Sequence, residues 1–301
     1  MPVESDQGRE QIVNPNRESA PSTQAVQVED LTITLDGARV RFQRAGSGAA
    51  LLLVHGLLGY SFSWRYTIPA LAHHATVYAP DLPGTGFSDA PPGLDCSMRT
   101  CAERLLRFMD AVGVSDCDLL GTSHGGGISM LAASIAPERI RRLILVDPVN
   151  PWSEHGTVLS VFLSNPGIAP IFLKLVPQLR ILEQFYFRRM WGDPRRIRPG
   201  TLEGYMKPLY RPGAFKYGIS VLRSWNRDLG EVKSALPLIS HIPTLLIWGS
   251  RDAAVDPKSA AKLQSHFRDC RLLMMEGIGH LPYEEAPEEF NRTVIEFLGN
   301  Q

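Results

Sequence analysis

The stretch "GTSHGGG", residues 121–127, decides the fold, because it joins two different apolar patterns around one serine. The run before it, "DCDLLG" (116–121), is short and apolar like a buried strand, and "GGISMLAASIA" (126–136) continues as a helix. Gly-x-Ser-x-Gly between a strand and a helix is typical of a sharp turn that exposes the serine hydroxyl. We therefore interpret Ser123 as a nucleophile and not as an incidental serine of a glycine-rich loop.

The alternation of strand and helix extends along the chain on both sides of this turn. A hairpin around Asp36-Gly37 opens the folded part. Predicted strands then cover 49–56, 75–81, 116–121, 142–147, 244–249 and 271–276, and predicted helices cover 62–72, 97–113, 126–136, 258–267 and 284–298. This order predicts an α/β fold with a mostly parallel sheet and helices on both faces.

Two segments depart from the alternation. Residues 1–25 are polar and offer nothing to bury, so we expect a disordered tail. Residues 150–236 are rich in aromatic side chains and interrupted by prolines, and a structureless loop of that length is implausible in a compact domain. We expect these residues to form an inserted helical cap (lid) on a core made of 26–149 and 237–301.

Composition excludes several classes of function. Lys+Arg and Asp+Glu both number 31, so the net charge gives no reason to expect nucleic acid as a partner. The N-terminal segment lacks the basic and apolar parts of a signal peptide, and no later run has the length of a membrane span. The four cysteines lack zinc-type spacing and indicate reduced thiols. We expect a cytoplasmic protein acting on a small molecule, with its oligomeric state left open.

Polar residues follow the predicted strands, at the edge where parallel sheets gather reactive groups. They are His55, Asp81, Ser123, Asp147, Asp252 and His280. A serine, carboxylates and histidines on separate loops of one sheet edge can converge as a nucleophile, a base and a group that orients the base.

The base is expected on a distant loop and not beside the serine. On a sharp turn adjacent side chains point apart, so the His124 ring should miss the hydroxyl, while its backbone N–H is placed to bind an oxyanion. His280 follows the last predicted strand, among glycines that permit a tight approach, and is our candidate base. The "HGLLG" loop (55–59) offers a second N–H, that of Leu57, with His55 bracing the loop.

A histidine base needs a carboxylate that holds its tautomer and stabilises its charged form. Asp252, close after the strand at 244–249, is the preferred candidate. Asp256 precedes Pro257 and is interpreted as a helix cap. Asp147 remains a rival for the role, because it also follows a predicted strand.

Five motifs resemble the α/β-hydrolase superfamily, and they cover about 270 residues, all but the tail. In chain order they are "HGLLG" (55–59), "DLPGTGFSD" (81–89), "GTSHGGG" (121–127), "WGSRDAAVDP" (248–257) and "GHLPYEEAPEEF" (279–290). The resemblance implies the doubly wound α/β-hydrolase fold with a cap. It also implies a catalytic triad of Ser123, Asp252 and His280, and an oxyanion hole made by the N–H groups of Leu57 and His124. It implies no metal and no cofactor.

The nucleophile separates the branches of that superfamily. Haloalkane dehalogenases and epoxide hydrolases use aspartate where this chain has Ser123, which disfavours both. The resemblance favours a serine esterase that cleaves a carboxylic ester of a small to medium apolar substrate through an acyl-enzyme. Meta-cleavage-product hydrolases split carbon–carbon bonds with a serine, but they usually carry tryptophan after the histidine, where this chain has Leu281. They are the alternative, and a non-catalytic small-molecule-binding member is a second one.

The predicted cap is where we expect substrate specificity. Its aromatic side chains suggest an apolar pocket, for which Trp152, Phe187 and Trp191 are candidates, together with Leu281 beside the histidine. Five arginines crowd the same region, between Arg188 and Arg198. We interpret them as a solvated helix face in preference to a site for a substrate carboxylate.

Overall fold

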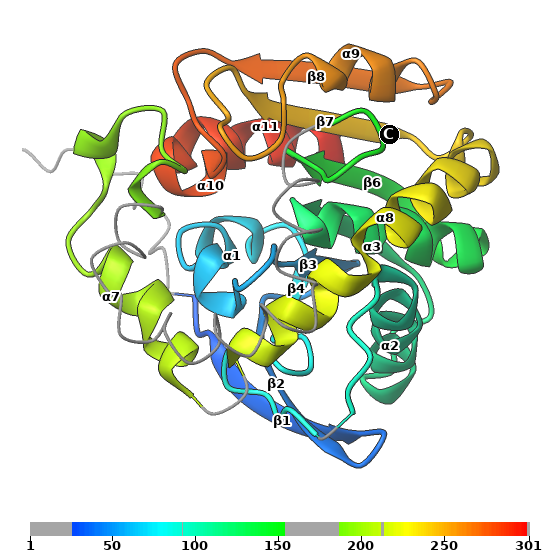
Figure 1. Cartoon of the computed structure of the whole chain (residues 1–301), viewed down its shortest axis with the longest axis vertical. Coiled ribbons are helices and arrows are strands. Elements are labelled where there is room, and N and C mark those ends of the chain that lie inside the picture. Colours follow the sequence, from blue (N-terminus) through cyan, green and yellow to red (C-terminus); the bar gives the residue numbers. More distant parts are fainter. Residues whose placement is uncertain (1–25, 92, 154–186, 212–213, 300–301) are drawn as a thin grey trace, which may run out of the picture.

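The computed structural model describes residues 26–91, 93–153, 187–211 and 214–299. Eight strands form one sheet in the order β1-β2-β4-β3-β5-β6-β7-β8 (Figure 1). They are β1 (Glu29–Leu35), β2 (Ala38–Ala45), β3 (Ala50–Val54), β4 (Thr76–Pro80), β5 (Cys117–Thr122), β6 (Ile140–Val146), β7 (Thr244–Gly249) and β8 (Cys270–Met275). β2 pairs antiparallel with both β1 and β4, and all other pairs are parallel. The predicted mostly parallel sheet is confirmed.

β1 and β2 form the predicted hairpin. Its turn residues, Asp36 and Gly37, lie between the paired residues Leu35 and Ala38 and have positive φ angles of 50° and 76°. A two-residue turn of this kind needs φ above zero at both positions, which aspartate and glycine tolerate. The Asp-Gly signal therefore identifies the antiparallel edge of the sheet correctly.

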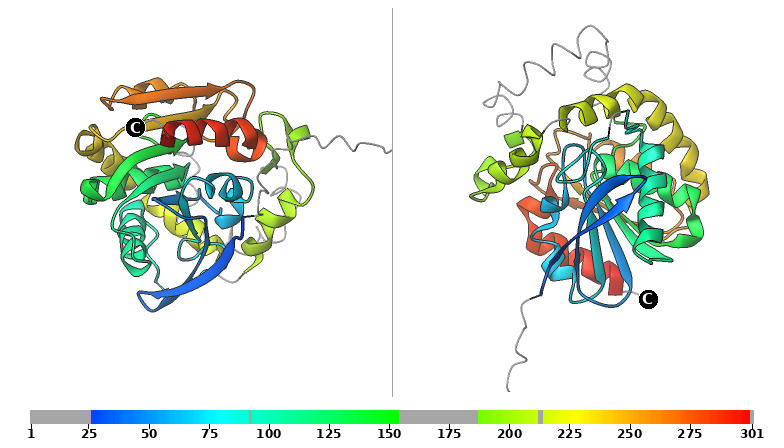
Figure 2. Two further views of the ribbon diagram at one scale, coloured as in Figure 1. Left: turned by 180° about the vertical axis from the view of Figure 1, so that it is seen from behind. Right: turned by 90° about the horizontal axis from the view of Figure 1, so that it is seen from below.

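Helices cover both faces of the sheet (Figure 2). Successive residues of a strand point to opposite faces, and in β3 Leu52 and Val54 join one apolar cluster while Leu51 and Leu53 join the other. The first cluster is covered by α2 (Met98–Ala111), α3 (His124–Ile135), α8 (Ala214–Ile239) and α9 (Ser259–Gln264). The second is covered by α1 (Ile68–Leu71), α10 (Pro282–Glu285) and α11 (Pro287–Gly299). The doubly wound architecture is confirmed.

Two predicted helices differ from those observed. The helix expected at 62–72 is a 3-10 turn, η1 (Ser61–Trp64), followed by the single turn α1. The helix expected at 284–298 is interrupted at Ala286, which separates α10 from α11. Ala286 has φ −139° and ψ 59°, outside the helical region, because the ring of a following proline disfavours that region for the residue before it.

The predicted cap is only partly within the described residues. Its described part contains η4 (Pro194–Arg196), α7 (Thr201–Met206), η5 (Lys207–Tyr210) and most of α8, while residues 154–186 lie outside it, as does the predicted tail. α8 runs through the predicted boundary at 236–237 and buries Val232 and Leu236 in the same cluster as α2 and α3. The division into core and cap stays a prediction. Neither α8 nor any other helix in the described ranges combines the length and apolar character that a membrane crossing requires.

The two-sided burial of the sheet gives a test of where its stability resides. Leu246→Ala on β7, whose side chain is fully buried, is expected to lower the free energy of unfolding by about 2–5 kcal/mol, because it leaves a cavity in the first cluster. Met274→Ala on the neighbouring strand β8, where the side chain is 40% exposed, should lower it by less than about 1 kcal/mol. Urea unfolding measures both, and equal losses would contradict this placement of the core.

Candidate active site

Four sequence-predicted residues follow four neighbouring strands at one edge of the sheet. Ser123 follows β5, Asp147 follows β6, Asp252 lies just after β7, and His280 lies on the loop after β8. Because β5, β6, β7 and β8 are adjacent and parallel, their carboxyl ends bring these loops side by side. One oxygen of each aspartate and one ring nitrogen of His280 lie within 4.8 Å of one another.

Ser123 occupies the predicted strand-to-helix turn in a strained backbone conformation. It has φ 53° and ψ −122°, and it directly precedes α3. Its N–H donates to the carbonyl of Val146 at 2.9 Å, and its carbonyl accepts from the N–H groups of Gly126 and Val149 at 2.9 and 3.0 Å. A positive φ is uncommon for a residue with a side chain and persists where the surroundings hold it. Here β6, the turn after β6 and the start of α3 hold it, through Val146, Val149 and Gly126 respectively.

The glycines on either side of the serine are required by close contacts. A Cβ at Gly121 would lie 2.4 Å from the Gly125 carbonyl oxygen, and a Cβ at Gly125 would lie 2.4 Å from the Val54 carbonyl oxygen. The loop after β3 also approaches the serine, since a Cβ at Gly56 would lie 3.1 Å from the Ser123 Cβ. The serine turn and the "HGLLG" loop are thus in contact, as an oxyanion hole built from both requires.

Asp252 and His280 form the one direct contact among the three predicted triad residues. His280 Nδ1 lies 2.8 Å from Asp252 Oδ2, and both side chains are buried. The other carboxylate oxygen, Asp252 Oδ1, accepts from the N–H groups of Ala254 and Val255 at 2.6 and 3.0 Å. In the described part of the chain, Ser123 makes no hydrogen bond to His280. Catalytic hydrogen bonds are often long before substrate is bound.

Two backbone N–H groups beside the serine have no partner among the described residues. They belong to Leu57, in the "HGLLG" loop, and to His124, the first residue of α3. The first N–H groups of a helix have no acceptor within it, and the helix dipole favours negative charge at that end. Both groups are therefore available to an oxyanion at Ser123.

The His124 ring is unsuited to act as a base. It is fully buried, and neither of its ring nitrogens has a hydrogen-bond partner within the described residues. Burial, with a smaller contribution from His55, lowers the pKa of His124 to about 3. A ring with so low a proton affinity cannot take a proton from a serine effectively, in agreement with the prediction that the base lies elsewhere.

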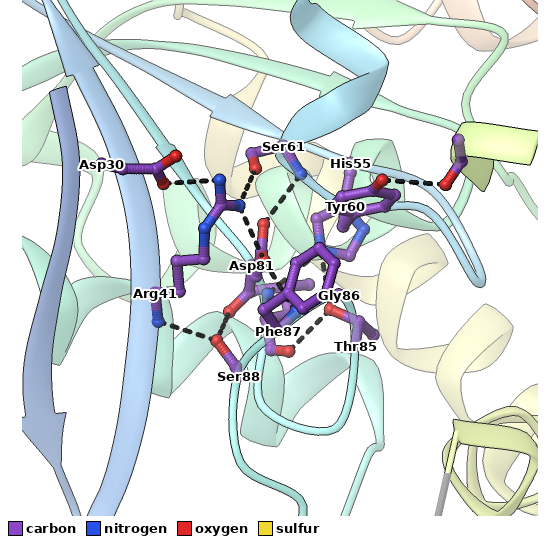
Figure 3. A network of polar contacts seen from close by, with 12 residues as sticks. Asp30, Arg41, His55, Tyr60, Ser61, Asp81, Thr85, Gly86, Phe87 and Ser88 are labelled. Carbon is purple, nitrogen blue, oxygen red and sulfur yellow. Dashed lines mark hydrogen bonds and ion pairs between the residues drawn. The ribbon is translucent and has the colours of Figure 1, made fainter. Parts of the chain in front are cut away.

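His55 braces the "HGLLG" loop, as expected (Figure 3). Its Nε2 accepts from the Leu82 N–H at 3.0 Å and contacts Thr85 Oγ1 at 3.0 Å, so Nδ1 carries the proton that is donated to the Gly56 carbonyl at 2.8 Å. Burial lowers the pKa of His55 below its usual value and keeps the ring neutral. The ring ties the loop that carries Leu57 to the turn that follows β4.

Asp81 also joins the chain after β3 to the turn after β4 (Figure 3). Its buried carboxylate accepts from the N–H groups of Ser61 and Phe87 at 2.8 and 2.9 Å and from Arg41 Nη1 at 3.2 Å. Arg41 also pairs with Asp30 at 2.5 Å. The polar residue after β4 is therefore a structural brace.

Comparison with known proteins agrees with this geometry. Residues 49–287, most of the chain, match the family model described as alpha/beta hydrolase fold. The chain belongs to this family. It is 27% identical over 277 residues to 2-hydroxymuconate semialdehyde hydrolase of Pseudomonas sp. (strain CF600), covering 87% of this chain and 91% of that protein. It is also 27% identical over 287 residues to epoxide hydrolase 4 of Homo sapiens, covering 87% and 76%.

A solved structure shares the fold of this alpha/beta hydrolase. Cfl2 from Burkholderia cenocepacia matches it with a TM-score of 0.79 at 22% sequence identity, over 90% of this chain and 96% of that one.

Sequence reasoning missed the role of Glu285 in placing the hydrolase's histidine loop. The side chain is completely buried and accepts from the N–H groups of Gly192, Asp193 and Gly279 at 2.9, 2.9 and 2.8 Å, with Arg196 Nη1 at 3.2 Å. It thereby joins the segment before η4 to the residue preceding His280. In the sequence Glu285 looks like a solvated helix residue. The only unusual feature of this region is the two pairs of glutamates in "PYEEAPEEF".

Glu284 makes a second buried connection next to it. Both of its carboxylate oxygens bind the Arg65 guanidinium, and the Tyr205 hydroxyl donates to it at 2.7 Å. Arg65 continues to Thr201 Oγ1 at 2.9 Å and lies 4.0 Å from the centre of the Phe62 ring. Burial, opposed by Arg65, raises the pKa of Glu284. This network attaches α7 to α10, one turn after His280.

The four predicted pocket residues do not form one group. Phe187 and Trp191 contact each other, with ring centres 5.5 Å apart. Trp191 and Leu281 belong to the second cluster, and Phe187 packs against it. Trp152 instead stacks on His266, with ring centres 4.7 Å apart, against the first cluster. Their role in binding substrate stays a prediction.

The arginine cluster separates into two sets. Arg195, Arg196 and Arg198 pair with Asp193, Glu285 and Glu288 respectively. Arg188 and Arg189 are exposed and line a shallow pocket over Trp191 and Pro194, together with Arg251. Most of the cluster therefore has a structural explanation, which supports the interpretation as a solvated surface.

The Glu285 clamp makes a specific prediction. Glu285→Gln replaces one of the accepting oxygens by an amide group among N–H donors, so it should lower the free energy of unfolding by about 2–4 kcal/mol. Glu288→Gln is the matched control, because that side chain is 79% exposed, and it should change stability by less than about 0.5 kcal/mol. Chemical denaturation measures both, and a harmless Glu285→Gln would show that the clamp does not hold the loop.

Proposed function

We propose that this hydrolase is a serine esterase that cleaves a carboxylic ester of a small to medium apolar substrate through an acyl-enzyme. One observation carries the proposal: the His280–Asp252 hydrogen bond lies at the sheet edge where Ser123 is held in a strained turn. The free N–H groups of Leu57 and His124 support it, because an ester carbonyl becomes negatively charged when serine attacks it.

The mechanism follows from the positions of these groups. His280 Nε2 takes the proton from Ser123 Oγ, which attacks the ester carbonyl carbon, and the N–H groups of Leu57 and His124 bind the oxyanion. Asp252 accepts a hydrogen bond from His280 Nδ1–H and stabilises the imidazolium that forms. His280 then protonates the leaving alcohol, and a water molecule, deprotonated by His280, releases the acid from Ser123.

The serine favours a carbonyl substrate over an epoxide or a haloalkane. Attack by a serine oxygen on a saturated carbon would give an ether, which water and a histidine do not cleave, so the enzyme would stop after one turnover. An aspartate would give an ester in the same step, which can be hydrolysed. The similarity to epoxide hydrolase 4 is therefore interpreted as shared fold and ancestry and not as the same reaction.

A carbon–carbon bond hydrolase is the second candidate. It is favoured by the similarity to 2-hydroxymuconate semialdehyde hydrolase, which extends over 91% of that protein. The Ser123 turn and the oxyanion hole would serve a ketone carbonyl as well as an ester. A third candidate, a non-catalytic small-molecule-binding member, requires a serine without reactivity.

Ser123→Ala is expected to lower kcat/KM for a p-nitrophenyl ester by at least about 10⁴-fold, because no nucleophile remains. Ser134→Ala on the same helix α3 is the control, since among the described residues that hydroxyl binds only the Leu131 carbonyl, and it should retain the wild-type rate. A fluorophosphonate probe should label Ser123 of the wild type and leave Ser123→Ala unlabelled. An unlabelled wild type would support the non-catalytic candidate.

A substrate panel distinguishes ester from carbon–carbon cleavage. We expect kcat/KM for p-nitrophenyl esters of short to medium acids to exceed that for a 2-hydroxy-6-oxo-dienoate, with both measured spectrophotometrically on the same preparation. The opposite order, with both activities lost in Ser123→Ala, would replace the esterase proposal by the second candidate. Activity on either substrate that survives in Ser123→Ala would reject the triad itself.

A further inference from the structure

Asp147, the rival acid of the sequence, lies beside the Asp252–His280 pair and has no role in the mechanism above. It follows β6 and is fully buried. Its Oδ1 accepts from the Gly249 N–H at 2.9 Å, whereas Oδ2 has no hydrogen-bond partner among the described residues when the carboxyl group is treated as ionised. One of its oxygens lies within 4.8 Å of both Asp252 and His280.

No cation in the described part of the chain compensates these two neighbouring carboxyl groups. No lysine or arginine among the described residues pairs with either aspartate. The titratable groups that face Asp147 are Asp252, His280 and the phenol of Tyr283, which is itself buried. Two neighbouring carboxylates in a buried site cannot both be ionised without a large cost, so one of them holds a proton.

The hydrogen bonds decide which aspartate holds that proton. Asp252 contacts His280 and accepts from two backbone N–H groups, those of Ala254 and Val255. Within the described ranges Asp147 accepts from a single backbone N–H, that of Gly249. Hydrogen bonds from donors favour the charged form of a carboxyl group, so Asp252 is the carboxylate. Burial, and next the negative charge of Asp252, raise the pKa of Asp147 well above its ordinary value.

We propose that Asp147 is a neutral carboxylic acid that donates its Oδ2 proton to the Asp252 carboxylate and so acts as a positioning residue for the Asp252–His280 pair. The protonated form gives the unpartnered Oδ2 a donor proton and an acceptor beside it. It also keeps a single negative charge next to His280. The positioning role rests on the proposed function, whereas the protonation state does not.

The backbone connects Asp147 to the nucleophile as well. Asp147 has φ 44°, its N–H donates to the Ile247 carbonyl at 2.9 Å, and two residues later the Val149 N–H donates to the Ser123 carbonyl at 3.0 Å. A Cβ at Gly126 would lie 2.6 Å from the Pro148 side chain, so this turn packs directly on the start of α3. One strained turn therefore contacts the serine turn on one side and the acid–histidine pair on the other.

Kinetics of two variants test the positioning role. Asp147→Asn keeps a neutral side chain with an NH₂ group that can donate and a carbonyl oxygen that can accept, so it should retain kcat/KM to within about threefold, with the acidic limb of the pH–kcat/KM profile unmoved. Asp147→Ala removes the donor and should lower kcat/KM by about 10- to 100-fold, as expected for a group that supports a catalytic residue. If Asp147 were ionised, Asp147→Asn would remove a negative charge beside His280 and move the acidic limb to lower pH by about 1 unit or more. That shift would overturn the proposal.

Stability tests the protonation state without using activity. A folded-state pKa above the unfolded value means that the native protein binds the extra proton, so its stability falls as pH rises from about 4, the unfolded value, towards the folded pKa. Asp147→Asn cannot ionise and does not lose stability in this way. The melting temperature of the variant minus that of the wild type should therefore increase from about pH 5 to about pH 8. A difference that stays constant, or decreases, over this range would overturn the neutral acid. If Ser123→Ala retained activity while this trend held, only the proposed function would fail.

Discussion

Ser123 has a positive φ, and backbone atoms of neighbouring segments lie close to the glycines on both sides of it. The arrangement of these segments depends on the close packing of the serine turn. Such a conformation is unfavourable for serine by about 1–3 kcal/mol, so it exists only where tertiary contacts fix it. The carbonyl of Val146, at the end of β6, and the N–H of Val149, in the turn after β6, fix it, and the closeness of β3 excludes any side chain at Gly125. The sheet and the start of α3 therefore hold the proposed nucleophile in this conformation.

Buried carboxylates then hold the loops that carry the other groups. Asp81, Asp252 and Glu285 each accept N–H groups from loop residues, and Asp81 also accepts the N–H of Ser61, the first residue of the 3-10 turn η1. A loop at a sheet edge has N–H groups that neither a helix nor a strand satisfies, and burying them unpaired would be costly. A carboxylate accepts several at once, so it fixes a loop more firmly than a neutral acceptor would.

The sequence predicts the sheet and its two layers well, because they depend on local patterns of apolar residues and on turns such as Asp36-Gly37. It also predicts His280 and Asp252 as partners, since the position after a strand sets which edge a residue occupies. It fails where a contact depends on distant parts of the chain. Glu285 looks exposed within its own helix and is buried only because Gly192 and Gly279 approach it. Likewise, the stacking of Trp152 on His266 joins residues far apart in the chain, and the sequence does not indicate it.

Asp147 and Asp252 illustrate a limit of a different kind. Each follows a strand of the same parallel sheet, so spacing alone can only rank them as alternatives. The structure shows that they are neighbours, and a neighbour changes the chemistry of each: the carboxylate with more N–H donors keeps the charge, and the other is left as an acid. A pair of this kind leaves one negative charge beside His280 while supplying Asp252 with a further hydrogen bond. Which of two aspartates serves the histidine is therefore settled by the backbone donors around them, which no side-chain pattern in the sequence records.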